Sequence, residues 1–124
     1  MEETKSDFAN HIGGMRVKRI DEDNYEFFAE VKEINLNTGK IAHGGFICSI
    51  ADTGMGNAAH IVAGNKRCVT INLDIKYISA GKLNEKIVGK VKVLKKTKTL
   101  VFISSEILGA NGVVANASGV WKIL

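Results

Sequence analysis

The chain of 124 residues carries 17 lysines and arginines against 13 aspartates and glutamates, and 45 % of its residues are hydrophobic. This length and composition predict a single domain over residues 1–124, which buries about two-thirds of the surface that its unfolded chain exposes. The net charge of +4 is modest and no nucleic-acid-binding motif accompanies it, so nucleic acid is excluded as a predicted partner.

The sequence also predicts a cytoplasmic protein without a membrane span. The opening residues lack the apolar stretch of a signal peptide. The most apolar segment, residues 41–63, contains an aspartate, two histidines and four glycines, which a membrane-spanning helix disfavours. Cys48 and Cys68 form no C-x-x-C pair and suggest no disulfide framework, which fits a reducing compartment.

The first part of the chain predicts a lead-in followed by two strands. Residues 1–14 form the lead-in, with a short helix that ends at two glycines. A brief strand over residues 15–20 follows, and residues 24–34 alternate apolar and polar side chains as a half-buried strand does. Residues 35–39 then form a loop.

Residues 40–66 are the segment around which the chain is organised. From Phe46 to Val62, apolar residues recur at three- and four-residue steps, which predicts a helix that is enclosed by protein on most sides. Asp52 is the only charged side chain between Lys40 and Lys66. Because an unpaired buried carboxylate is costly, we expect Asp52 to be paired, hydrogen-bonded or functional.

Four further strands are predicted after the helix, over residues 69–78, 86–95, 99–108 and 113–123. In the first of them, alternation places Val69, Ile71, Leu73, Ile75 and Tyr77 on one apolar face. Asn111-Gly112 is a hairpin signal, and short links predict that consecutive strands are antiparallel neighbours. The chain is thus predicted to be an α+β fold, in which an antiparallel sheet of five to six strands wraps one long central helix.

The start of the helix has the properties of a binding site for a carbonyl oxygen. The first N–H groups of a helix have no partner within it, and at Gly44 and Gly45 no side chain blocks the approach of a ligand. The alternative is an ordinary glycine turn. Gly44 and Asp52 are eight residues, or about 12 Å, apart on one helix, too far to act on one reacting carbon. Two helices packed antiparallel in a dimer, through the small residues Gly54, Gly56, Ala58 and Ala59, would bring Gly44 of one chain to Asp52 of the other.

His43-Gly44-Gly45, the aspartate within a long apolar helix and the strands that follow resemble the hotdog-fold acyl-CoA thioesterases. The resemblance runs from about Asn37 to the C-terminus and is greatest to the branch of the phenylacetic-acid-pathway thioesterase and thioesterase superfamily member 2. It implies hydrolysis of an acyl- or aryl-acyl-CoA to free acid and CoA, with no cofactor beyond the CoA of the substrate. It also implies a homodimer, with dimers paired into a homotetramer.

The resemblance assigns roles to individual residues. Asp52 is the general base or, less favoured, the nucleophile, and the Gly44 N–H polarises the thioester carbonyl. Thr70 helps to hold the attacking water, with an ordinary strand threonine as the alternative. Asn37 lies near the thioester or is a turn residue. His43 orients its loop, assists the leaving thiolate, or is purely structural.

Substrate binding is predicted at Gly45 and at a basic turn. Seven lysines lie between Lys82 and Lys98, with Glu85 as the one acid among them. Most are expected to form a solvated strand surface, whereas Lys95, Lys96 and Lys98 are the predicted contacts of the CoA phosphates. No spacing of histidine, cysteine and acidic residues predicts a metal site.

Two other functions remain open on the sequence alone. A non-catalytic acyl-CoA binder or sensor would share the fold but would have no use for a buried base. An enoyl-thioester hydratase or dehydratase would use a histidine and a carboxylate, which His43 and Asp52 can supply. The acyl group is not predicted, because the pocket depth depends on which side chains close its end, the candidates being Phe46, Met55, Ile61 and Tyr77.

Overall fold

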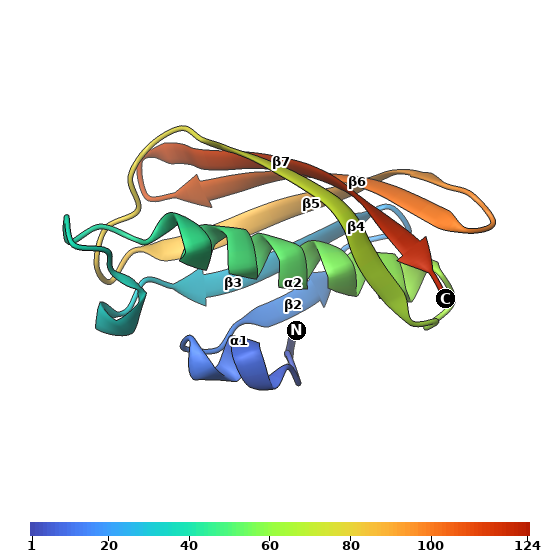
Figure 1. Cartoon of the computed structure of the whole chain (residues 1–124), viewed down its shortest axis with the longest axis horizontal. Helices are drawn as coiled ribbons and strands as arrows, with labels where there is room; N and C mark the ends of the chain where they lie inside the picture. The colour runs from blue at the N-terminus through green and yellow to red at the C-terminus, as the bar shows by residue number, and fades with distance from the viewer.

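A computed structural model describes all residues from 1 to 124 and shows a long helix lying across one face of a curved antiparallel sheet (Figure 1). The long helix is α2 (Gly44–Val62), and two short helices precede it, α1 (Asp7–His11) and the 3-10 helix η1 (Glu33–Asn35). The strands are β1 (Glu2–Glu3), β2 (Arg16–Arg19), β3 (Asn24–Glu30), β4 (Cys68–Tyr77), β5 (Lys86–Lys96), β6 (Leu100–Gly109) and β7 (Gly112–Ile123).

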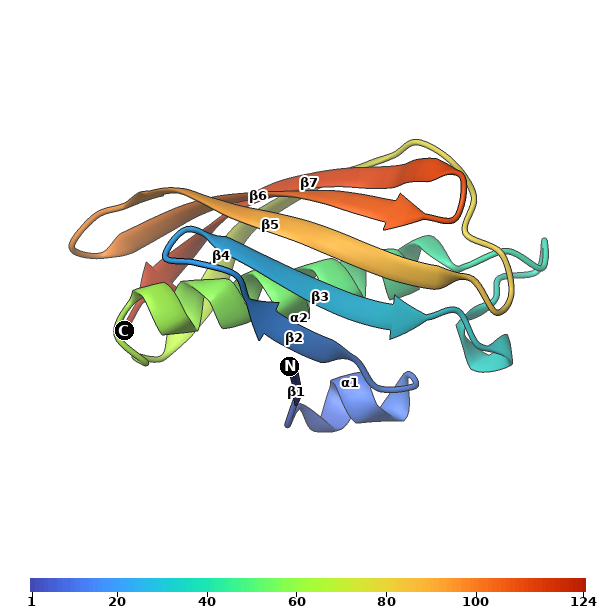
Figure 2. The same ribbon diagram turned by 180° about the vertical axis from the view of Figure 1, so that it is seen from behind.

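The predicted α+β hotdog arrangement is confirmed, with one more strand than expected. The sheet has seven strands in the order β1-β2-β3-β5-β6-β7-β4. The additional strand is β1, whose two residues pair with Arg16 and Val17 of β2 in the segment predicted as a lead-in. Seen from behind, α1 lies at the β2 edge of the molecule, whereas β4 forms the opposite edge of the sheet (Figure 2).

The expectation that all consecutive strands are neighbours is wrong for β4 and β5. Strand β5 pairs with β3 and β6, while β4 pairs with β7 at the far edge. The link over residues 78–85 therefore crosses the ends of two intervening strands. Strands lie about 4.8 Å apart, so the crossing spans about 14 Å, and eight extended residues reach about 27 Å. The link is short in sequence but long enough to make this crossing.

Helix α2 buries one face against the concave side of the sheet. Phe27 of β3 lies between Gly54 of α2 and Gly89 of β5, and a Cβ atom at either glycine would overlap its ring. Both glycines are therefore required for the helix and β5 to approach Phe27 this closely. The fully buried face of α2 consists of Phe46, Ile47, Ile50, Ala51, Gly54, Met55, Ala58 and Ala59.

Two predictions about the solvent exposure of α2 and β4 are wrong for the single chain. Helix α2 is not enclosed on most sides, because one stripe of it is accessible to solvent, and Asp52 is half-buried on that accessible side. The apolar face predicted for β4 is also largely open, with Val69 43 %, Ile71 55 % and Tyr77 57 % exposed. Strand β4 is an edge strand, and nothing in the chain covers its outer side. A register shift between Thr70 and Asn72 also breaks the predicted alternation, so that Thr70 as well as Tyr77 reaches α2.

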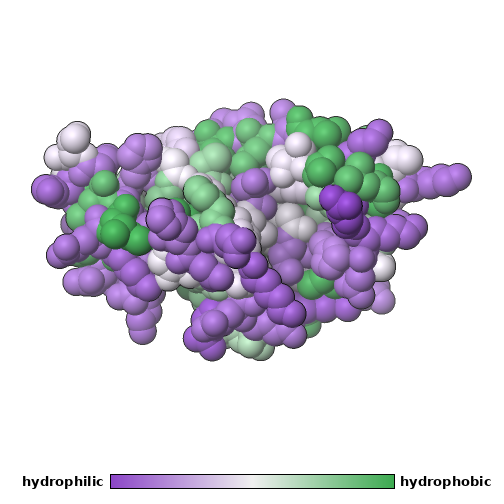
Figure 3. All heavy atoms as spheres, turned by 60° about the horizontal axis from the view of Figure 1, so that its bottom comes forward, coloured by the Kyte–Doolittle hydropathy of each residue, from purple (hydrophilic) through white to green (hydrophobic).

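Apolar side chains reach the surface in separate patches rather than in one continuous face. Figure 3 shows such patches set among hydrophilic residues on the side of the molecule that it presents. Single exposed apolar residues are normal on a folded protein, so only the group on β4 calls for a covering partner.

Candidate active site

The first turn of α2 leaves a single backbone donor free. His43 is the N-cap, and its ring Nδ1 accepts the Gly45 N–H at 2.7 Å. The carbonyl oxygen of His43 accepts the N–H groups of Phe46 and Ile47. The Gly44 N–H donates to no group of the chain. A helix N-terminus whose one unused donor belongs to a glycine, a residue with no side chain of its own, is suited to bind an oxygen that gains negative charge.

Asp52 lies about two turns further along α2 and accepts a hydrogen bond from a residue of β4. The Thr70 hydroxyl donates to Asp52 Oδ1 at 2.6 Å, and the second carboxylate oxygen accepts no hydrogen bond from the chain. The structure thus brings together two of the predicted residues. It leaves one oxygen of Asp52 free to accept a proton, which is what a general base requires.

Cys48 lies between these two groups, one turn from Gly44 and one turn from Asp52. Burial raises the pKa of the Cys48 thiol, and the charge of the Asp52 carboxylate raises it further. The thiol is therefore kept in its neutral form, which is a poor nucleophile. Sequence reasoning did not single out this residue, although its spacing of four from each neighbour places it on their side of the helix.

Tyr77 is the residue at this site whose position the sequence did not reveal. Its hydroxyl donates to the Gly44 carbonyl oxygen at 2.8 Å, across 33 residues of sequence. A Cβ atom built on Gly44 would lie 3.3 Å from the Tyr77 ring, so the ring packs directly against the glycine. Sequence reasoning treated Tyr77 only as a candidate wall of the pocket. No local signal predicts this contact, because it depends on how β4 crosses α2.

Asn37 is placed in a tight turn before α2. Its side-chain oxygen accepts the N–H groups of Gly39 and Ile41, at 2.9 Å and 3.2 Å. Asn37 is therefore a turn residue in the single chain. Its predicted role near the thioester stays a prediction. Lys40 within this turn has a positive φ of 63°, a backbone conformation that the two hydrogen bonds help to hold.

The predicted lysines lie apart from the helix start. Lys95 and Lys96 end β5 and Lys98 follows in the hairpin turn, and all three are exposed. The pairing of Leu100 with Lys122, and of Cys68 with Ile123, puts this turn at the end of the sheet where β4 begins. In Figure 1 the hairpin projects beyond the C-terminal end of α2, away from Gly44.

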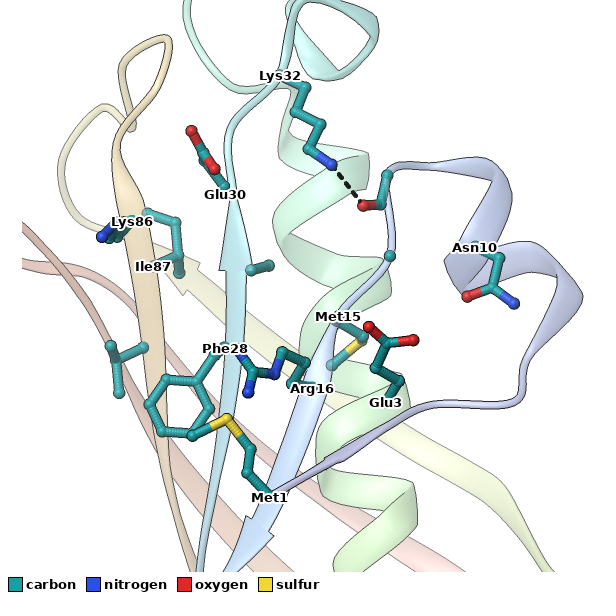
Figure 4. A pocket seen from close by; sticks show the side chains of 14 residues that line it. Met1, Glu3, Asn10, Met15, Arg16, Phe28, Glu30, Lys32, Lys86 and Ile87 are labelled. Carbon is teal, nitrogen blue, oxygen red and sulfur yellow. Dashed lines mark hydrogen bonds between the residues drawn. The ribbon is translucent and has the colours of Figure 1, made fainter.

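Two of the hollows on the surface bear on the site, and the larger of these two holds none of the candidate catalytic residues. It has a volume of about 710 Å³ and lies between the N-terminal segment and strands β2, β3 and β5, where Arg16, Phe28 and Lys86 line it (Figure 4). The smaller, of about 310 Å³, adjoins the start of α2. It is lined by Phe8, Ile12, Ile34, Asn35, Leu36, His43, Gly45, Phe46 and Ser49.

The chain contains neither a cluster of metal-ligating side chains nor a helix suited to a membrane. No three or more histidine, cysteine or acidic side chains are grouped so that they could hold a metal ion. None of the helices has the length and apolar character needed to cross a membrane.

Three solved structures share the fold. PaaI, from the phenylacetic acid degradation operon of E. coli, superposes with a TM-score of 0.87 at 21 % identity, covering 97 % of this chain and 86 % of that chain. A mutant of the phenylacetic acid degradation protein PaaI from Thermus thermophilus gives 0.86 at 18 % identity, covering 96 % and 100 %. Zebra fish thioesterase superfamily member 2 gives 0.80 at 24 % identity, covering 89 % and 81 %. Among curated proteins, none matches the chain in sequence.

The sequence profile of the thioesterase superfamily matches residues 39–115, which is more than half of the chain. The matched range contains the start of α2, Asp52, Thr70 and Tyr77. The resemblance inferred from the sequence is thereby confirmed at the level of the superfamily, and the shared architecture confirms the fold. The chain belongs to the thioesterase superfamily and is a thioester hydrolase with the hotdog fold.

Proposed function

We propose that this protein hydrolyses acyl-CoA or aryl-acyl-CoA thioesters to the free acid and CoA, at sites shared between two copies of the chain. The observation that carries the proposal is the pair of unused groups on α2, the Gly44 N–H and one oxygen of Asp52. Thioester hydrolysis needs one donor for the developing oxyanion and one base for the attacking water, and these two groups supply them.

In this mechanism the Gly44 N–H donates to the thioester carbonyl oxygen. Asp52 takes a proton from a water molecule while the water oxygen attacks the carbonyl carbon. The tetrahedral intermediate carries its negative charge on the oxygen facing Gly44, and its collapse breaks the carbon–sulfur bond. The proton held by Asp52 passes to the leaving thiolate, which gives CoA and a carboxylic acid. Direct attack by Asp52, through a transient anhydride, is the alternative route.

The geometry of one chain supports a shared site. Gly44 and Asp52 belong to one uninterrupted helix, so they stay about 12 Å apart within a chain. Strand β4 has a free edge along ten residues and exposes Val69 and Ile71. Long apolar edge strands are surfaces on which a second copy adds its own strand. We propose a two-fold dimer in which two β4 strands pair and bring the neighbouring α2 helices together.

Three of the four small residues first considered for this helix contact are not available, and only Gly56 is accessible. Gly54, Ala58 and Ala59 are buried against the chain's own sheet, so they cannot contact a partner helix. The accessible side of α2 carries other short or uncharged side chains, namely Gly45, Ser49, Thr53, Gly56, Asn57 and His60. These still allow a close approach of two helices, and they flank Asp52. The further pairing of dimers into a tetramer stays a proposal that light scattering tests.

The acyl group and the CoA phosphates of the substrate are each assigned to a part of the surface. The hollow of about 310 Å³ beside His43 and Gly45 is mostly apolar, and an engineered apolar cavity of about 150 Å³ already takes up benzene. We therefore assign the hollow to an aryl or medium-length acyl group. The exposed Lys95, Lys96 and Lys98 are assigned to the CoA phosphates. A cytoplasmic location is proposed from the free thiols of Cys48 and Cys68.

A panel of acetyl-, octanoyl-, phenylacetyl- and benzoyl-CoA, assayed for release of free thiol, tests the function. We expect turnover of at least one of the three larger substrates and lower kcat/KM for acetyl-CoA. Binding of all four without thiol release would support the sensor alternative instead. Consumption of an enoyl-CoA double bond without thiol release would support a hydratase.

Thr70→Val is expected to lower kcat by about tenfold, less than the loss of the base itself. The change removes the hydroxyl that donates to Asp52 Oδ1 but keeps the shape of the side chain. A hydrogen bond to a charged group contributes more than a neutral one, which sets this magnitude. Thr70→Ser retains the hydroxyl and serves as the control, measured in the same thiol-release assay. A larger loss from Thr70→Val than from Asp52→Asn would show that the two roles are assigned the wrong way round.

A further inference from the structure

We infer that Tyr77 is a positioning residue, which holds the Gly44 N–H in the direction that the oxyanion requires. This inference rests on the proposed function and adds a residue to that site. Its basis is the hydrogen bond of 2.8 Å from the Tyr77 hydroxyl to the Gly44 carbonyl oxygen, together with the packing of the ring on the glycine.

Gly44 needs external support because glycine is the least restricted residue in φ and ψ. It is flanked by two peptide planes. The plane before it is held by the His43 carbonyl oxygen, which accepts two N–H groups of the helix. The plane after it is held at both ends, its N–H by the His43 ring and its carbonyl by Tyr77 in addition to the helical hydrogen bond from the Cys48 N–H. With both planes fixed, the N–H of Gly44 keeps one direction before substrate arrives, which is the condition for efficient oxyanion stabilisation.

The phenol remains a donor under ordinary assay conditions. Burial raises the pKa of the Tyr77 hydroxyl above its ordinary value, and the nearby Cys48 raises it further. The O–H proton therefore stays in place from neutral to mildly alkaline pH. The contribution of Tyr77 should accordingly be constant over the range in which the enzyme is assayed.

Strand β4 then supports both halves of the site. It carries Thr70, which donates to Asp52, and Tyr77, which donates to Gly44. Both contacts run from this edge strand to α2. Strand β4 is also the strand that we expect to pair with a second copy. Formation of the dimer would thereby steady the donor and the base at the same time.

Tyr77→Phe is the test, because it removes one hydroxyl and leaves the ring against Gly44. We expect kcat to fall about three- to tenfold with KM unchanged, the size of one modest hydrogen bond that acts in the transition state. Tyr25→Phe is the matched control, since the Tyr25 hydroxyl also donates to a backbone carbonyl, that of Glu22, outside the site. That variant should keep the kcat of the wild type. Thermal unfolding of both variants verifies that each is folded.

A spectroscopic measurement separates positioning from a general loss of structure. In the Asp52→Asn background, a substrate labelled with ¹³C at the thioester carbonyl stays intact while bound. Its carbonyl stretch should move to lower wavenumber on binding, and the added Tyr77→Phe change should reduce that displacement. If the wild type is active, and Tyr77→Phe is equally active and leaves the carbonyl stretch unaltered, Tyr77 does not position the donor. The proposed function would stand in that case. A wild type that hydrolyses no thioester would overturn the proposed function, and this inference with it.

Discussion

Asp52→Asn is expected to lower kcat/KM for the best acyl-CoA by about 10²- to 10⁴-fold, the usual cost of removing a general base. The amide has the shape of the carboxylate and can still accept the Thr70 hydroxyl, but it cannot take a proton from water. The measurement is thiol release under conditions in which substrate binding is also determined. Binding should change little, because the loss falls on the chemical step.

Asp23→Asn is the control for this prediction. Asp23 is exposed in the turn between β2 and β3, and its carboxylate forms no hydrogen bond or ion pair within the chain. Its neutralisation removes the same charge at a place away from both α2 and β4 and should leave turnover unchanged. A folded Asp52→Asn protein that turns over at the wild-type rate would remove Asp52 from the mechanism.

Gly44→Pro is expected to lower kcat by about 10²- to 10³-fold, the usual loss when an oxyanion donor is removed. Proline has no backbone N–H, and position 44 is the first residue of α2, where helices accept proline well. The preceding residue, His43, has φ −62° and ψ 137°, which is the region that a residue before proline prefers. The substitution therefore removes the proposed donor without breaking the helix.

Gly44→Ala separates the missing N–H from the added bulk. Both substitutions place a Cβ atom about 3.3 Å from the Tyr77 ring, but alanine keeps the backbone donor. We expect Gly44→Ala to retain most of the turnover that Gly44→Pro loses. Equal losses in the two variants would mean that crowding against Tyr77 causes the defect and that the N–H is not the donor.

The periodicity of the sequence predicted the main elements because it reports which side chains face the core. The three- and four-residue spacing of Ile47, Ala51, Met55 and Ala58 predicted the central helix, and alternation predicted the strands. The same spacing also applies to two of the small residues of the helix. Gly54 and Ala58 share the buried stripe of the helix with Met55, so their spacing already placed them against the sheet.

The hydrophobic periodicity of the sequence could not predict the strand order or the contacts between distant residues. Alternation tells which face of a strand is apolar, but it does not tell which strand lies beside it. The position of β4 at an edge, and hence the exposure of Ile71, depends on pairings between distant segments. The contacts from Thr70 to Asp52 and from Tyr77 to Gly44 depend on the same pairings. The resemblance to a known family suggested the first contact, and nothing in the sequence suggested the second.

Co-refolding of two inactive variants tests whether each active site takes Gly44 from one chain and Asp52 from another. Asp52→Asn and Gly44→Pro proteins are unfolded together, refolded, and assayed for thiol release, with mixed dimers identified by mass. In a mixed dimer with two-fold symmetry, one site receives both lesions and the other receives neither. We expect about half of the wild-type activity for each mixed dimer. Mixed dimers no more active than the two parent proteins would contradict this expectation, because each site would then be built within one chain.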